Sequence, residues 1–233
     1  MESLTNISLK HNTDKSTAHN YTNIYDKYLS SIRGTNINLL EIGIGGYGNS
    51  EDGGGSLKMW RDYFIKGHII GLDIEEKKLN LGDRIHIFQG SQESKKDLDK
   101  ILKKFQSLDI IIDDGSHLNK HQIKSFELLF PHLNKGGYYF IEDIQSSYIL
   151  NYNGDGFYLN NKKTAINYFK TIIDKINFQE IENPFFQADY FCKNITEIHF
   201  YHNLIVIKKD DNNEKSNIII NNSKYPKGKN LLK

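Results

Sequence analysis

The 233-residue chain contains one cysteine, three prolines and almost no net charge. The single cysteine, Cys192, excludes an internal disulfide framework and a cysteine-based zinc site, and it is typical of a reducing compartment. Thirty basic and 29 acidic side chains give no electrostatic reason to expect nucleic acid or an anionic membrane as a partner. No apolar run is long enough to cross a bilayer, and residues 1–20 lack the apolar centre of a signal peptide. We therefore expect a cytoplasmic protein with a small-molecule partner, and the sequence leaves a homo-oligomer open.

Apolar runs alternate with amphipathic segments along most of the chain. Strands are predicted at 36–46, 68–74, 84–90, 110–113 and 138–144, and helices at 56–64, 94–105, 121–133 and 162–176. Ser56 is a candidate cap of the first of these helices, and Gly136 with Gly137 closes the third. Residues 195–209 form two further strands around a tight turn at His202 and Asn203. This order predicts an α/β fold with a doubly wound, mostly parallel sheet and a closing antiparallel hairpin.

Three segments are expected to differ in role. Residues 1–35 form a helical preamble in which Tyr21, Tyr25 and Leu29 share helical spacing. Residues 36–210 carry the sheet. Residues 211–233 are rich in Lys, Asn and Asp, and we expect a mobile tail or a crossing arm there.

The first strand runs into a glycine turn, EIGIGG, at 41–46. Residues without a Cβ allow a ligand to approach the main chain closely. A G-x-G-x-x-G dinucleotide fingerprint would open directly into a helix, whereas this turn continues through Tyr47 to Asp52 first, and the acids Glu51 and Asp52 would repel a diphosphate. Asp73, at the end of the second strand, suits hydrogen bonding to the two hydroxyl groups of a ribose. The pattern favours a nucleoside without phosphates.

Two strands end on pairs of acids, IIIDDGSH at 110–117 and YYFIEDI at 138–144. Parallel sheets bind ligands outside the carboxyl ends of their strands, so these side chains are expected to face one another across a site. Acids at the rim of a buried sheet are typical of a cation site, a proton transfer or a polar ligand. The candidates are Asp113, Asp114, His117, Glu142 and Asp143.

The runs LLEIGIGGYGN, GLDI, RIHIFQGSQ, IIIDDGSH and FELLFPHLNKGGYYFIEDIQSSY, with the preamble NTDKSTAHNYTNIYDKYL, resemble the class I S-adenosylmethionine-dependent methyltransferases. They are most similar to the mycinamicin and demethylmacrocin O-methyltransferases, over roughly residues 10–150. The resemblance implies a seven-stranded Rossmann-like sheet, S-adenosylmethionine and Mg²⁺ as cofactors, and transfer of a methyl group to a sugar hydroxyl.

The resemblance also implies roles for particular residues. His117 would be the general base, and Asp114, Glu142 and Asp143 would hold magnesium, with Asp114 also counted as catalytic. Apart from the resemblance, we expect substrate contacts from His19 and Tyr21 in the preamble and from Tyr148 in a later loop. The cofactor would be bound by Glu41, Gly43, Gly45, Gly46, Ser56, Asp73, Ile74, Gln89, Ser91, Gln92 and Asp113.

Other interpretations stay open at this point. Asp113 could brace its turn instead of touching ligand, the other acids could cap helices and pair with lysines, and His117 could simply begin a helix. Residues 147–158 could be a solvated connector or a substrate lid. An NAD(P)-dependent sugar-nucleotide oxidoreductase or epimerase, or a non-catalytic S-adenosylmethionine-binding module, could use the same sheet.

The acceptor is open as well. Abundant Lys, Asn and Ile with only three alanines suggests an AT-rich bacterial genome. That composition favours a nucleotide-activated hexose or heptose for capsule or surface polysaccharide over a glycosylated natural product.

Overall fold

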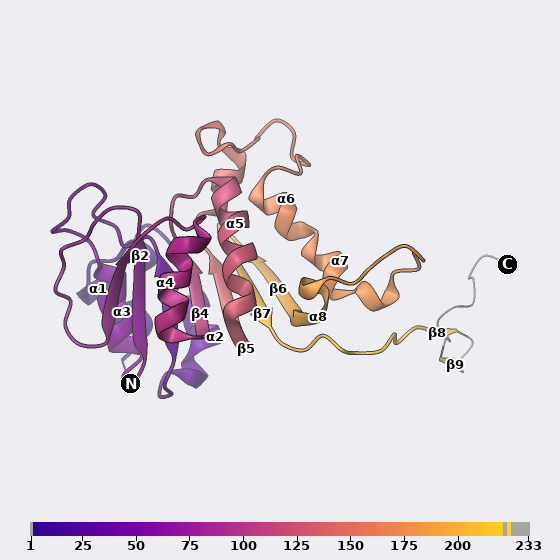
Figure 1. Ribbon diagram of the computed structural model, residues 1–233, viewed down its shortest axis with the longest axis horizontal. Coiled ribbons are helices and arrows are strands. Elements are labelled where there is room, and N and C mark those ends of the chain that lie inside the picture. Colours follow the sequence, from indigo (N-terminus) through magenta and orange to yellow (C-terminus); the bar gives the residue numbers. More distant parts are fainter. Residues whose placement is uncertain (1, 221–222, 225–233) are drawn as a thin grey trace.

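The computed structural model describes residues 2–220, 223 and 224, and it is built around one seven-stranded sheet with the order β3-β2-β1-β4-β5-β7-β6 (Figure 1). The first five strands run parallel, and β7 pairs antiparallel with both β5 and β6. This confirms the predicted doubly wound sheet and its closing hairpin. The strands of the sheet are β1 (Asn38–Ile42), β2 (His68–Asp73), β3 (Ile85–Gln89), β4 (Leu108–Asp113), β5 (Leu133–Ile141), β6 (Ile195–Tyr201) and β7 (Leu204–Lys209).

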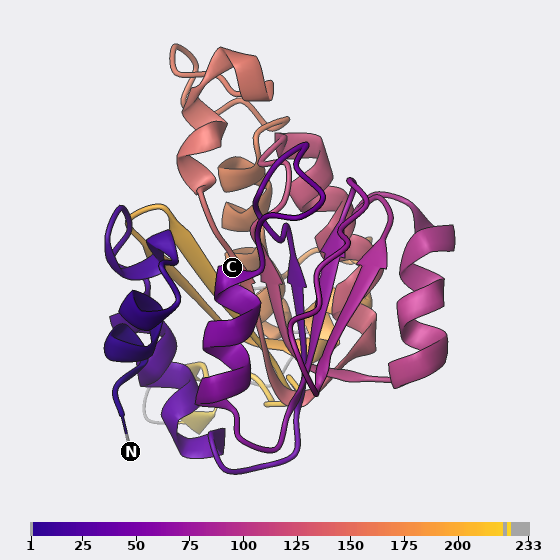
Figure 2. The same ribbon diagram turned by 90° about the vertical axis from the view of Figure 1, so that its left-hand side faces the viewer.

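Helices cover both faces of the sheet, and Figure 2 shows α3 with the N-terminal helices on one side and α4 on the other. The α-helices are α1 (Leu4–Lys10), α2 (Thr22–Leu29), α3 (Gly55–Tyr63), α4 (Lys95–Phe105), α5 (Asn119–Leu129), α6 (Ala165–Lys170), α7 (Ile172–Ile176) and α8 (Tyr190–Asn194). Short 3₁₀ turns, η1 to η6, are Asp14–Ser16, Ser30–Ile32, Phe130–His132, Ile144–Tyr148, Leu150–Tyr152 and Phe178–Glu180. A separate small hairpin joins β8 (Ile219–Ile220) to β9 (Ser223–Lys224). None of the helices in the described ranges is both long enough and apolar enough to cross a membrane.

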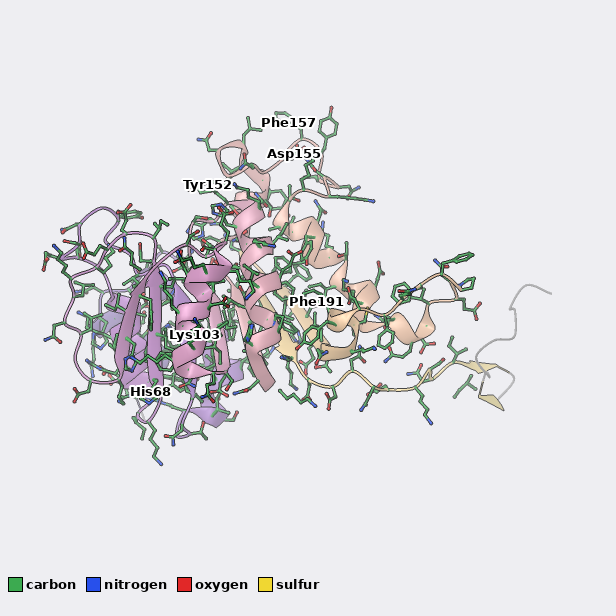
Figure 3. All side chains as sticks on the ribbon, in the orientation of Figure 1. His68, Lys103, Tyr152, Asp155, Phe157 and Phe191 are labelled. Carbon is green, nitrogen blue, oxygen red and sulfur yellow. The ribbon has the colours of Figure 1, made fainter. Side chains whose placement is uncertain are left out.

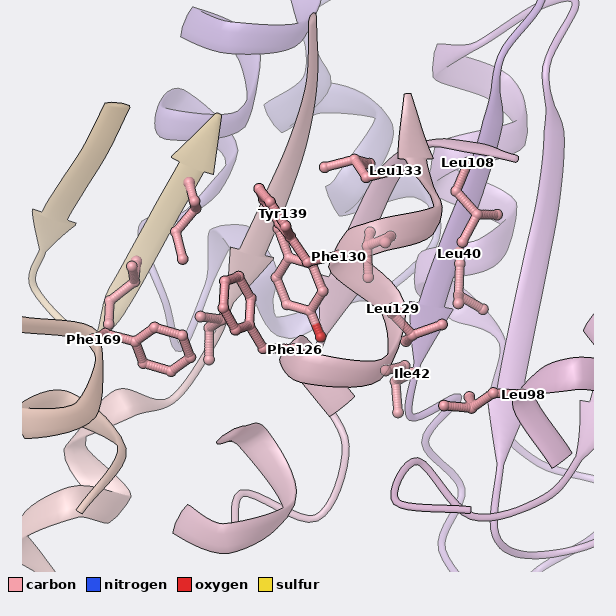
Figure 4. Close-up of a cluster of buried hydrophobic side chains, with 14 of the residues drawn as sticks. Leu40, Ile42, Leu98, Leu108, Phe126, Leu129, Phe130, Leu133, Tyr139 and Phe169 are labelled. Atoms are coloured by element: carbon pink, nitrogen blue, oxygen red, sulfur yellow. The ribbon is translucent and has the colours of Figure 1, made fainter. Parts of the chain in front are cut away.

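Each face of the sheet has its own hydrophobic core, because successive strand residues point to opposite sides. One core packs α4, α5, α6 and α7 on the sheet, and Figure 4 shows its aromatic centre around Phe126, Tyr139 and Phe169. The other packs α1, α2 and α3 on the opposite face around Tyr25 and Trp60, whose ring centroids lie 5.0 Å apart. The N-terminal segment is thereby part of the second core.

Three local predictions differ from the structure. Strand β5 begins at Leu133 and continues through Gly136 and Gly137, so the glycine pair does not close the preceding helix. The predicted helix at 162–176 is two helices, α6 and α7, which are separated at Thr171. Ser56 does not cap α3: the cap position is Gly54, in the left-handed conformation with φ 73°. Glycine adopts this conformation without the strain that a Cβ introduces.

The topology places a crevice at the carboxyl ends of β1 and β4. The chain steps outward from β1 to β2 and β3, and then returns across β1 to β4. The connections on the two sides of this reversal diverge, which leaves the space where doubly wound sheets bind their ligands. The glycine turn after β1 and the acids after β4 and β5 all lie at this edge.

Candidate active site

A cavity of about 920 Å³ opens at the carboxyl edge of the sheet. The glycine turn forms one wall: Gly43 has φ 87°, and a Cβ there would meet the backbone oxygen of Asp114 at 2.1 Å. Asp73 fixes the same turn, because its Oδ2 accepts the backbone N–H of Ile44 at 2.9 Å while its Oδ1 accepts that of Glu75 at 2.9 Å. Backbone and carboxylate therefore meet in a wall shaped for a polar ligand.

Glu41 in β1, the acids after β4 and β5, and His117 form two overlapping groups that share Asp114. In each group the possible metal-ligating atoms lie within 4.8 Å of one another. The inner group, Glu41, Asp114 and Glu142, is mostly buried, since Glu41 and Glu142 are 0% and 2% exposed. The outer group, Asp114, His117 and Asp143, lines the cavity.

The ammonium group of Lys15 lies inside the inner group. Its Nζ is 2.6 Å from Oε1 of Glu142, 2.9 Å from Oδ2 of Asp114 and 3.3 Å from Oε1 of Glu41. Burial lowers the pKa of Lys15, but the three carboxylates outweigh that effect and hold the pKa well above its ordinary value. For Glu142, burial raises the pKa of the carboxyl group. The negative charge of Asp114 raises it further, and the ammonium group of Lys15 opposes the rise.

Two tyrosines from the N-terminal segment hold the acids that follow β5. The hydroxyl of Tyr25 donates to Oε1 of Glu142, and that of Tyr21 donates to Oδ1 of Asp143 at 2.8 Å. Burial and the adjacent Asp143 raise the pKa of Tyr21, so its hydroxyl stays protonated as a donor. His19 stacks on the ring of Tyr21, with centroids 4.7 Å apart. Residues far apart in sequence are therefore fixed as one polar cluster.

His117 and Asp143 face each other in unusual backbone conformations. His117 has φ 55° and Asp143 has φ 52°, a left-handed region that residues other than glycine seldom adopt. The Nε2 atom of His117 lies 3.7 Å from Oδ2 of Asp143. Its Nδ1 atom is buried and has no hydrogen-bond partner in the described part of the chain. The imidazole therefore lies at the cavity wall with one nitrogen, Nδ1, that forms no hydrogen bond to the described residues.

Asp113 points into the protein, away from the cavity. It is fully buried, and it accepts hydrogen bonds from Gln92 at 2.9 Å and from the hydroxyl of Ser125. Burial raises the pKa of this carboxyl to about 6. These contacts describe a residue that braces the turn after β4.

The structure distributes the predicted site residues between the cavity wall and its surroundings. The residues that line the cavity are Gly43, Gly45, Gly46, Ser56, Asp73, Ile74, Ser91, Gln92, Asp114, His117 and Asp143. Those outside the lining are Glu41, Gln89, Asp113, Glu142, His19, Tyr21 and Tyr148. Ser56 lines the cavity, and its hydroxyl also donates a hydrogen bond to Oε2 of Glu41 at 2.8 Å. The individual roles of all these residues stay predictions.

Beside the cavity, residues 144–160 form a segment that rises beyond the carboxyl ends of the strands. Figure 3 shows Tyr152, Asp155 and Phe157 along it. The ring centroid of Tyr152 lies 6.3 Å from that of His117. Farther along the segment, the side chain of Phe157 is 91% exposed. The segment therefore approaches the polar cluster through Tyr152, and it carries apolar side chains that are exposed to solvent.

Sequence reasoning missed the contribution of Lys15 and Tyr25 to the polar cluster. In the sequence, Tyr25 shows only helical spacing. Nothing in the sequence marks Lys15 as a site residue, because a lysine in a polar stretch is ordinarily a solvated surface residue. Both side chains lie more than 95 positions from the acids that they contact after β4 and β5.

Comparisons with known proteins agree with this architecture. The chain is 40% identical over 190 residues to the mycinamicin VI 2''-O-methyltransferase of Micromonospora griseorubida, which covers 81% of this chain and 48% of that protein. It is 38% identical over 203 residues to a Streptomyces olivaceus tetracenomycin-C 3'-O-methyltransferase that acts on the 8-demethyl-8-(2-methoxy-alpha-L-rhamnosyl) compound. This match covers 86% of this chain and 52% of that protein. No family model matches the chain.

A solved structure superimposes closely as well. The MycE methyltransferase from the mycinamycin biosynthetic pathway, in complex with Mg and SAH, matches with a TM-score of 0.88 at 38% identity, over 92% of this chain and 56% of that one. The fold is that of the class I S-adenosylmethionine-dependent methyltransferases, which confirms the predicted fold class. In sequence, the chain is similar to the mycinamicin VI and demethylmacrocin O-methyltransferases. It spans about half the length of these relatives.

Proposed function

We propose that this protein is a magnesium-dependent O-methyltransferase that transfers the methyl group of S-adenosylmethionine to a sugar hydroxyl. The observation that carries the proposal is the continuity of one cavity. Its wall joins the glycine turn and Asp73 at one end to Asp114, His117 and Asp143 at the other. A nucleoside cofactor and a proton-accepting site are thus brought into one space.

The cofactor would lie along the glycine turn. Asp73 would accept hydrogen bonds from the ribose hydroxyls, and Ser91 and Gln92 would lie near the adenine. The acids Asp52 and Glu75 on this part of the wall disfavour the diphosphate of a dinucleotide and suit a cofactor with a positive sulfonium group. The same acids argue against the NAD(P)-dependent alternative.

The donor set fits magnesium. Mg²⁺ prefers hard oxygen ligands and commonly uses one or two carboxylates together with water or substrate oxygens. Asp114 and Asp143 supply such oxygens at the cavity wall, and Glu142 adjoins Asp114 in the inner group. We infer that Asp114, Glu142 and Asp143 would hold the ion. A bound Mg²⁺ would supply a Lewis acid that orients the acceptor hydroxyl and lowers its pKa.

Methyl transfer breaks the carbon–sulfur bond and forms a carbon–oxygen bond, and the hydroxyl proton must go to a base. His117 lies at the cavity wall, and Asp143, 3.7 Å from its Nε2, can orient the ring. Neutral imidazole is the side chain best suited to accept a proton near neutral pH. His117 would therefore take the proton of the acceptor hydroxyl.

The acceptor we favour is the sugar of a glycosylated small molecule. The tetracenomycin-C relative acts on a rhamnosyl compound, and the MycE methyltransferase belongs to the mycinamycin biosynthetic pathway. Six acidic side chains but only two lysines line the cavity, which disfavours the phosphates of a nucleotide-linked sugar. The exposed apolar side chains at 148–159 suit the aglycone of a glycoside. A capsule precursor and a homo-oligomer stay predictions without such support.

Calorimetric titration with S-adenosylhomocysteine, with and without Mg²⁺, and with NAD in its place, is the direct test. We expect S-adenosylhomocysteine to bind and NAD to fail. A methyl-transfer assay with glycosides and nucleotide sugars, each with Mg²⁺ or with EDTA, then separates the remaining alternatives. Binding of NAD would overturn the methyltransferase proposal, and cofactor binding without any metal-dependent transfer would favour a non-catalytic module.

A further inference from the structure

The most unusual feature of the polar cluster is a lysine that is only 1% exposed among three carboxylates. A buried charge is costly unless it is paired and hydrogen-bonded, so this arrangement has to be held by the fold. The backbone around Lys15 is fixed at several points. Its carbonyl accepts the N–H of Tyr21 at 3.0 Å, and the adjacent Ser16 hydroxyl is 2.8 Å from that of Ser8.

The ammonium group occupies one of two cation positions that share Asp114. The inner position, between Glu41, Asp114 and Glu142, holds the Nζ of Lys15. The outer position, at Asp114, His117 and Asp143, faces the cavity. Because all three inner carboxylates already bind the ammonium group, a divalent ion could enter the inner position only by displacing it.

Lys15 also selects which carboxylate oxygens remain for an ion. It binds Oδ2 of Asp114 and Oε1 of Glu142, and the hydroxyl of Tyr25 donates to the same Oε1 atom. Each of the two carboxylates therefore has a second oxygen that Lys15 does not engage. This fixed choice of oxygens is a form of preorganisation, since ligands held by neighbouring hydrogen bonds need not reorient when a metal binds.

We propose that Lys15 is a resident counter-cation: it fills the inner cation position, restricts the protein to one divalent ion on the cavity side of Asp114, where Asp114, Glu142 and Asp143 would hold it, and orients Asp114 and Glu142 for that ion. This proposal rests on the proposed function, because it assigns a role in magnesium binding. Lys15 is a positioning residue in this scheme, since it acts through the carboxylates that it binds.

The charges around the cluster support a limit of one ion. When ionised, the four carboxylates of the cluster carry four negative charges, and Lys15 contributes one positive charge. The four are Glu41, Asp114, Glu142 and Asp143. One divalent ion then leaves a single negative charge. If Lys15 were neutral, the same four carboxylates could balance two divalent ions at the two overlapping positions.

The test is the stoichiometry of Mn²⁺, which replaces Mg²⁺ in oxygen-ligand sites and can be counted by paramagnetic resonance and by calorimetry. The full chain is titrated with Mn²⁺ in the presence of S-adenosylhomocysteine as the wild type, K15Q and K15R. We expect one ion in the wild type, two in K15Q, and one in K15R, which keeps the positive charge. A folded K15Q that binds the same number of ions as the wild type, with unchanged affinity, overturns the proposal.

If K15Q does not fold, the double variant K15Q/E41Q decides the question. It removes the ammonium group and one buried carboxylate together, so the net charge is unchanged. The inner position keeps Asp114 and Glu142 without a blocking cation, and we expect a second Mn²⁺ that binds more weakly than the first. The matched control, K15R/E41Q, should bind one ion. One ion in both double variants overturns the proposal.

The outcome is separable from a failure of the proposed function. A wild type that binds no Mn²⁺ would contradict the proposed magnesium dependence. In that case the orienting role of Lys15 fails too, and only its blocking role is read from the variants: an increase from none to one in K15Q supports the blocking role, and no increase refutes it.

Discussion

Replacing Asp73 with asparagine tests the cofactor position most sharply. The carboxylate stands at the end of β2, lines the cavity and accepts one backbone N–H on each oxygen, from Ile44 and Glu75 at 2.9 Å each. A ribose bound there would add two hydroxyl donors to the same carboxylate. D73N keeps the size of the side chain but removes its charge and one acceptor oxygen.

The size of the effect follows from these contacts. A hydrogen bond to a charged group contributes about 1.5–3 kcal/mol, and D73N weakens two of them without abolishing both, so we expect a loss of about 2–4 kcal/mol. That loss corresponds to roughly a 30- to 1000-fold increase in the Kd of S-adenosylhomocysteine. The assay is calorimetric titration of the wild type and D73N under identical conditions.

Two controls make the result decisive. E76Q removes the same charge from an exposed side chain three residues further on, and should change Kd by less than about threefold. The melting temperature of ligand-free D73N reports whether the turn at Ile44 survives the substitution. A folded D73N that binds S-adenosylhomocysteine within threefold of the wild type would refute the assignment of Asp73 to the ribose.

Three further predictions concern single side chains. Y25F removes the hydroxyl that donates to the buried Glu142 and should lower the free energy of unfolding by about 1–3 kcal/mol, read as a lower Tm by scanning calorimetry; an unchanged Tm would contradict the role of this contact. Asp113 has its pKa raised to about 6 by burial, so the folded state binds its proton more tightly and the wild type loses stability as pH rises from about 4 to 6. D113N lacks this loss, so its free energy of unfolding relative to the wild type should rise by roughly 2–3 kcal/mol between pH 4 and pH 7 in urea titrations, and a constant difference would refute the argument. H117A should slow methyl transfer by about 10²–10⁴-fold and leave the Kd of S-adenosylhomocysteine within threefold, whereas equal loss of both would indicate a structural role.

The sheet could be predicted because its signals are local. Buried parallel strands are short continuous apolar runs. In the helices between them, apolar residues recur at helical spacing within about 10 residues. Strand β5 was placed too late, at 138 instead of Leu133, because Gly136 and Gly137 are typical of a turn. Leu133 pairs with Leu108 and Tyr138 pairs with Ile110, and the register shift between these two pairs leaves Gly136 and Gly137 in an irregular part of the strand.

The grouping of acids at one edge could also be predicted, because parallel strands all end at the same side of a sheet. The sequence could not show that Asp114 belongs to two groups of potential metal ligands, nor that Asp113 turns inward towards Gln92. Adjacent residues after a strand point to opposite sides, and which of them faces the cavity depends on the exact end of the strand.

The sequence by itself therefore determined the order of strands and helices, the cofactor turn and the acidic edge, since each depends on residues close together along the chain. Only the tertiary structure decided what neutralises that edge. Lys15 meets Asp114 and Glu142 across 99 and 127 positions of sequence, after α1 and α2 have packed on the sheet. The reason is physical: a lysine becomes an internal cation only when the folded chain encloses it with carboxylates, and no local pattern records that enclosure.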